Sequence, residues 1–71
     1  MIILTKNFIL NEIYEKVKKI ENIKKRKIIE TIIKNKNWYI DIGFDMFYDI
    51  LLDLGYDKES IFKIYKELVI V

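Results

Sequence analysis

The stretch that decides the fold lies in the second half of the chain and reads Phe44-Asp-Met-Phe-Tyr-Asp-Ile-Leu-Leu-Asp-Leu54. At about 100° per residue, its large apolar residues cover roughly two thirds of the circumference of a helix. The narrow strip that remains holds three aspartates at i,i+4 spacing, Asp45, Asp49 and Asp53. A helix this apolar needs cover from its neighbours, so the pattern predicts a central helix with one acidic strip facing outward.

Two helices are predicted before this central one. Periodic apolar residues indicate the first from about Phe8 to Ile20, with Thr5 or Asn7 as its N-cap. The second follows Asn22, which can serve as its N-cap, and the tract at residues 34–37 ends it. Its predicted buried stripe consists of Ile28, Ile29, Ile32 and Ile33.

One more helix is predicted after the central one. Gly55 can supply the left-handed residue that closes the central helix, and Tyr56 can then fold back on Leu51. Asp57 can cap a helix that runs from about residue 58 to residue 69. The side chains expected to be buried in it are Ile61, Phe62, Ile64, Tyr65, Leu68 and Val69.

The segment between the second and central helices, residues 38–43, is apolar and rich in aromatic and β-branched residues. This composition favours a strand, so a short strand near residues 38–42 could pair with residues 1–4 or 68–71. The segment could equally form the first turn of the central helix, with Asp41 as its cap; we expect a packed linker. The chain, residues 1–71, is thus predicted to be one all-α domain, a compact array of four short helices around the central third helix.

Composition excludes several kinds of site. The 71 residues include no Cys and no His, which removes disulfides, thiolate or imidazole metal ligands, and Cys or His catalysis. No nucleophile–base pair or acid–base pocket can be assembled, so we expect no enzyme, no metal and no cofactor. No apolar stretch approaches the ~20 residues that cross a bilayer, and no signal peptide is visible, so we expect a cytoplasmic protein without a membrane partner.

Charge is distributed unevenly along the chain. Residues 1–37 carry ten Lys or Arg against four Glu, whereas residues 38–71 carry three Lys against seven Asp or Glu, although the net charge is only +2. The aspartate strip can therefore serve as a contact for a basic partner protein. It can also be a solvated face that the chain's own lysines balance.

Two sets of residues suggest nucleic-acid contact instead. A basic corner forms where the first helix ends and the second begins, and phosphate contact there would be independent of base sequence. Its members are Lys24, Lys25, Arg26, Lys27 and Lys34. The last two helices and their glycine turn form a helix-turn-helix pattern, although Glu59 and Glu67 share the face that would meet DNA. The residues that would contact the groove are Lys58, Ser60, Lys63 and Lys66.

We expect a small non-catalytic interaction module that binds a protein partner through charged helical faces. The alternative is a small nucleic-acid-binding protein that uses the helix-turn-helix and the basic corner. Apolar residues at 38–42 and 68–71 that stay exposed would also favour self-association as a homodimer.

Overall fold

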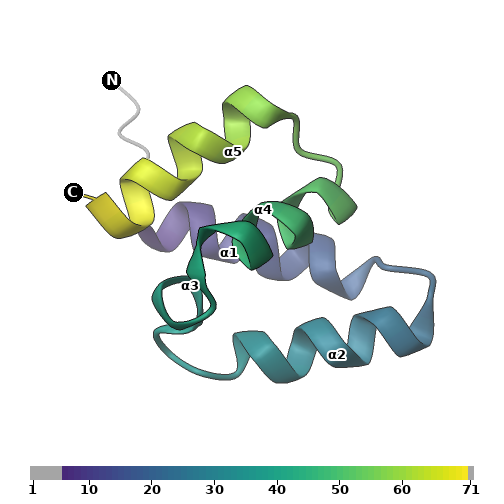
Figure 1. Ribbon diagram of the computed structural model, residues 1–71. Coiled ribbons are helices and arrows are strands. Elements are labelled where there is room, and N and C mark those ends of the chain that lie inside the picture. The colour runs from purple at the N-terminus through teal and green to yellow at the C-terminus, as the bar shows by residue number, and fades with distance from the viewer. Residues whose placement is uncertain (1–5, 71) are drawn as a thin grey trace.

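The computed structural model describes residues 6–70, which fold into helices joined by short turns (Figure 1). No residue in this range is in a strand. The α-helices are α1 (Lys6–Lys18), α2 (Ile23–Ile33), α3 (Trp38–Asp41), α4 (Gly43–Asp53) and α5 (Lys58–Tyr65), and the π-helix η1 (Lys66–Ile70) continues α5. The prediction of an all-α array is confirmed, and α3 adds one short turn to the four predicted helices.

Helix α4 is the central element, lying between α2 and α5 (Figure 1). One side of it is fully buried, since Phe47 and Leu51 are 0% exposed and Ile50 is 5% exposed. Its apolar side is only partly covered, however, because Met46 and Leu52 are 48% and 44% exposed. At about 100° per residue these two side chains flank the acidic strip, one on each edge. Neighbouring helices therefore cover a narrower arc of α4 than its apolar pattern predicts.

The indole of Trp38 joins three helices at the centre of the core. It stacks on Phe47 of α4 with ring centroids 5.9 Å apart, and its Nε1–H donates to the hydroxyl of Tyr14 on α1 at 3.3 Å. The neighbouring ring of Tyr39 meets it edge to face at 5.6 Å. A buried indole whose N–H has no hydrogen-bond partner would lower the free energy of unfolding. This hydrogen bond therefore fixes how α1 and α3 lie together.

The strand considered at residues 38–42 is wrong, and α3 replaces the expected linker. A strand would place Trp38 and Ile40 on one face and Tyr39 on the other. Instead Trp38 and Tyr39 are both buried while Ile40 is 53% exposed, which one helical turn allows. The backbone here also makes its own turn hydrogen bonds and needs no neighbouring strand. One candidate partner strand, residues 1–4, lies outside the described residues.

Of the N-caps predicted for the first two helices, the one for α2 is confirmed. The side chain of Asn22 accepts a hydrogen bond from the Lys25 backbone N–H at 3.1 Å, as predicted for an N-cap. Asn7 lies within α1 and cannot be its cap, while Thr5 lies outside the described residues.

Outside α4, two side chains that the periodicity placed in the core are exposed. Ile28 of α2 is 57% exposed, and Phe62 of α5 is 41% exposed. Phe62 stacks on Phe44 of α4, with ring centroids 5.3 Å apart, at the edge of the core. In both cases the neighbouring helix covers only part of the apolar stripe.

The turn between α4 and α5 has the predicted stop and start signals. Gly55 has a φ of +99°, and the backbone N–H groups of Gly55 and Tyr56 donate to the carbonyls of Leu52 and Leu51 at 3.0 and 3.1 Å. This pair of bonds is the Schellman motif. Asp57 then caps α5, because its carboxylate accepts from the Ser60 backbone N–H at 2.8 Å.

Across residues 6–70, no helix combines the length and apolar character that a bilayer span needs.

Replacing Gly55 tests the turn. Apart from its chain neighbours, no described residue comes within 4 Å of a Cβ placed at Gly55, so the cost of a side chain comes from the backbone conformation alone. We expect Gly55→Ala to lower the free energy of unfolding by about 1 kcal/mol, and Gly55→Asn to lower it by less. The urea midpoints of the two variants and the wild type measure this. Equal midpoints for Gly55→Ala and wild type would contradict it.

The Asp57 cap predicts a dependence of stability on acid pH. Hydrogen bonds from the backbone and side chain of Ser60 lower the pKa of Asp57 below its ordinary value of 3.8. The charged carboxylate is thus favoured in the fold, and its contribution is present at neutral pH and lost as the pH falls below 3.8. We expect the stability advantage of wild type over Asp57→Ser to shrink over that range. Thermal melts at a series of pH values would show a constant difference if the cap were unimportant.

Candidate interaction surfaces

An open groove runs between α2 and α4. It encloses about 400 Å³, and its floor is apolar, formed by Ile29, Ile32 and Ile50. We call it the α2–α4 groove. The side chains that line it are Asn22, Lys24, Lys25, Ile28, Ile29, Ile32, Met46, Asp49, Ile50 and Asp53.

The two walls of this groove carry opposite charge. Lys24 and Lys25 belong to the α2 wall, and Asp49 and Asp53 belong to the α4 wall. One ion pair spans the groove, with Lys25 Nζ 3.1 Å from Asp53 Oδ1, and the two side chains are 48% and 39% exposed. An ion pair this exposed contributes well under ~1 kcal/mol, so it can exchange partners at little cost.

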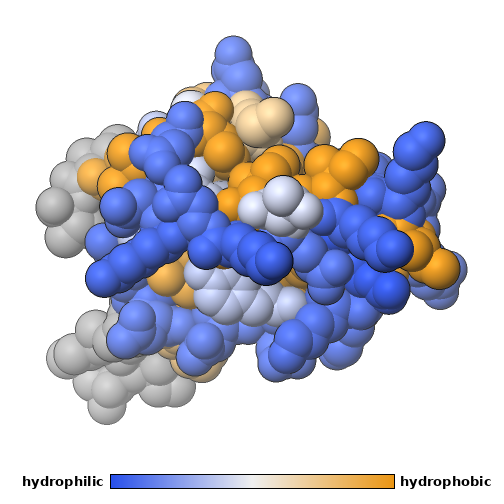
Figure 2. All heavy atoms as spheres, turned by 90° about the horizontal axis from the view of Figure 1, so that it is seen from below, coloured by the Kyte–Doolittle hydropathy of each residue, from blue (hydrophilic) through white to orange (hydrophobic). Residues whose placement is uncertain are grey.

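Apolar side chains also stand at the edges of the groove. Ile28 on the α2 wall and Met46 on the α4 wall are each about half exposed. Figure 2, which views the molecule from the side of α2, shows hydrophobic side chains interrupting an otherwise hydrophilic surface. Large apolar residues grouped in this way on a small domain are typical of an interaction site.

The acidic strip is only partly balanced by the chain itself. Asp53 pairs with Lys25, but Asp45 and Asp49 have no ion pair among the described residues. Those two aspartates line a second hollow together with Lys58 and the rings of Phe44 and Tyr48. One end of the strip is thus neutralised by Lys25, and the other end has no ion pair among the described residues.

The basic corner is divided among three surfaces. Lys24 and Lys25 face the α2–α4 groove, while the Nη1 of Arg26 donates to the carbonyl of Ile20, in the turn between α1 and α2, at 3.4 Å. The remaining two members, Lys27 and Lys34, line a different hollow that also contains Glu30 and Tyr14. The five cations therefore do not all face the same hollow.

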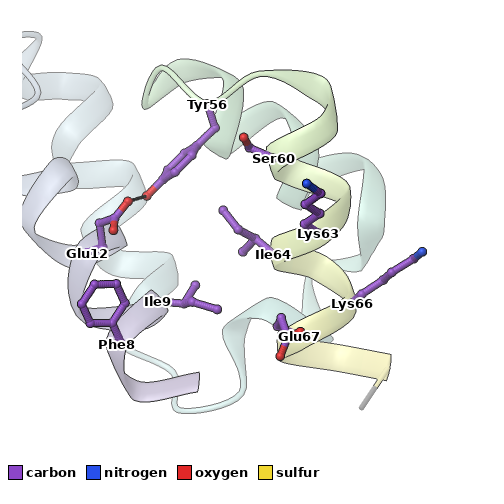
Figure 3. Close-up of a pocket in the computed structure, with 9 residues that line it drawn as sticks. All are labelled: Phe8, Ile9, Glu12, Tyr56, Ser60, Lys63, Ile64, Lys66 and Glu67. Carbon is purple, nitrogen blue, oxygen red and sulfur yellow. Dashed lines mark hydrogen bonds between the residues drawn. The ribbon is translucent and has the colours of Figure 1, made fainter. Parts of the chain in front are cut away.

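The residues predicted to meet DNA are divided as well. Ser60, Lys63 and Lys66 line a hollow of about 360 Å³ between α1 and α5, which also contains Glu12 and Glu67 (Figure 3). Lys66 points away from that hollow in Figure 3. Lys58 lies elsewhere, beside the aspartates of α4.

The α1–α5 hollow is closed at one end by a hydrogen bond. The Tyr56 hydroxyl donates to Glu12 Oε1 at 2.8 Å (Figure 3). Lys16 Nζ lies 4.9 Å from the centre of the same ring. Burial raises the pKa of the Tyr56 phenol, and the hydrogen bond and charge of Glu12 raise it further. The neutral phenol is therefore favoured, and it clamps the α4–α5 turn to α1.

No metal site stands out in the part of the chain that the structure describes. No three acidic side chains come close enough together there to hold an ion. The groove also contains two residues that the sequence did not indicate as site residues, Ile28 and Met46. The sequence did not indicate them because both were expected in the core. One signal in the sequence indicated this exposure. The apolar arc of residues 44–54 is wider than three short neighbouring helices can cover.

Comparisons with protein-family models, with curated proteins and with solved structures find no match.

Removing the Tyr56 hydroxyl tests the clamp. We expect Tyr56→Phe to lower the free energy of unfolding by about 0.5–1 kcal/mol at neutral pH, because Glu12 loses its donor. Tyr48→Phe is the matched control, since the Tyr48 hydroxyl has no hydrogen bond among residues 6–70. Chemical denaturation of both variants provides the measurement. A loss of equal size in the two would contradict a specific role for the Tyr56–Glu12 bond.

Proposed function

We propose that this protein is a non-catalytic interaction module that binds a protein partner through the α2–α4 groove. The observation that carries the proposal is the exposure of Ile28 and Met46, 57% and 48%, beside one basic and one acidic wall. An apolar centre with a charged rim is the usual anatomy of a protein interface. The groove thereby brings Asp49 and Asp53 of the acidic strip close to Lys24 and Lys25 of the basic corner.

The shape of the groove favours a helical partner surface. Helices of a partner that lie along the two walls can place apolar side chains at i, i+3 and i+4 spacing against them. Ile28 and Met46 on the walls offer such contacts, whereas the floor residues Ile29 and Ile50 are only 4% and 5% exposed. Lys24 and Lys25 on one side and Asp49 and Asp53 on the other would then select a partner that carries both signs of charge.

The polar side chains of the groove do not support catalysis. They are one amide, two lysines and two aspartates, and all five residues are exposed to solvent. An active site needs a nucleophile with a nearby base, or groups whose environment prepares them for proton transfer. A role in binding alone fits these residues better.

A nucleic-acid-binding role has less support. Affinity for a phosphate backbone needs cations that lie together along one surface. Here Lys25 is paired with Asp53, and Ser60, Lys63 and Lys66 share their hollow with Glu12 and Glu67.

A photo-crosslinking experiment tests the proposal. A photoreactive amino acid replaces Met46 in the full chain, which is then mixed with an extract of the source organism. We expect discrete adducts, reduced at least tenfold by the additional substitution Ile28→Glu, because a carboxylate at the centre of an interface is desolvated without a partner. The measurement is adduct yield and mass on a denaturing gel.

Ile40→Glu is the matched control for Ile28→Glu. Ile40 is 53% exposed, close to the 57% of Ile28, and it does not line the groove. We expect this control to leave the adducts unchanged. Absence of adducts, or equal loss with both substitutions, would count against the groove as an interaction site.

A further inference from the structure

We propose that the partner in the α2–α4 groove is a second copy of this chain, related to the first by a two-fold axis that runs along the groove. This inference rests on the proposed function and names its partner. The observation behind it is that one surface carries both halves of a complementary charge pattern, Lys24 and Lys25 facing Asp49 and Asp53.

Symmetry explains why this pattern suits self-association. In a two-fold dimer both copies use the same patch, and each contact occurs twice. Rotation about an axis along the groove exchanges its left and right sides, so the basic wall of each copy meets the acidic wall of the other. Rotation about an axis across the groove would instead bring like walls together, which is unfavourable. The charges therefore select one orientation.

The charged groups are available for contacts with the second copy. Lys24 and Asp49 have no ion pair in the part of the chain that the structure covers. The Lys25–Asp53 pair lies near the surface, with side chains 48% and 39% exposed, and can be exchanged for equivalent pairs between copies. Such an exchange keeps Lys25 and Asp53 paired and leaves Lys24 and Asp49 free to add a further pair between copies.

The apolar residues provide the centre of the contact. Ile28 and Met46 stand on opposite walls of the groove, so the same rotation brings Ile28 of each copy toward Met46 of the other. Both lose solvent exposure in the pair. A chain of 71 residues buries a smaller share of its surface than larger domains do, and association with a second copy is a common source of additional stability.

Charge reversal followed by mixing tests the inference. One variant carries Lys24→Glu with Lys25→Glu, which makes both walls acidic, and the other carries Asp49→Lys with Asp53→Lys, which makes both walls basic. We expect the wild type to dimerise and each variant alone to dimerise at least about 100-fold more weakly, because like charges face each other. We expect an equimolar mixture of the two variants to form a heterodimer. Sedimentation equilibrium of the full chains measures all three.

The control variant carries Lys34→Glu with Lys36→Glu, which makes the same change in charge as Lys24→Glu with Lys25→Glu but outside the groove. It should leave the dimer intact. Circular dichroism checks that each variant is folded. A wild type that is monomeric up to about 0.5 mM, or a dimer indifferent to the groove reversals, would overturn the inference. Photo-crosslinked adducts of another mass would then still support an interaction module with a different partner, whereas absence of all adducts would remove both proposals.

Discussion

The contact between Trp38 and Phe47 sets the arrangement of the other helices. The two rings stack with centroids 5.9 Å apart, and the indole N–H reaches Tyr14 on α1. Because Phe47 must face inward to make this contact, the rotation of α4 about its own axis is determined. At about 100° per residue, the acidic strip and the two apolar residues beside it are then turned outward. The exposed surface of α4 is thus a consequence of what its opposite side buries.

The α2–α4 groove follows from incomplete cover. A longer domain would place another element over the exposed side of α4, but in this chain the neighbouring helix α2 reaches only one edge of it. The result is a hollow with an apolar floor, flanked by Lys24 and Lys25 from one helix and by Asp49 and Asp53 from the other. Charges that are distant in the sequence come to face each other, and Lys25 Nζ lies 3.1 Å from Asp53 Oδ1. This juxtaposition supports both an interaction function and the identity of the partner as a second copy.

Local signals in the sequence were sufficient for the ends of several helices. Asn22, Gly55 and Asp57 act as predicted, because a cap or a left-handed residue acts through hydrogen bonds to residues only a few positions away. The strand considered at residues 38–42 was wrong for the opposite reason. Propensity favoured it, but the burial of two adjacent rings, Trp38 and Tyr39, depends on contacts with residues far away in the chain.

The candidate site divides in the same way. The sequence by itself determined that α4 is a helix with Asp45, Asp49 and Asp53 on one strip, because spacing along a helix is a local property. Only the tertiary structure decided that Asp49 and Asp53 of this strip face the lysines of α2, that the basic corner is divided, and that Ile28 and Met46 stay in contact with solvent. These outcomes depend on how far each helix covers its neighbours. A periodic pattern shows which side of a helix is apolar. It does not show how much of that side another helix can cover.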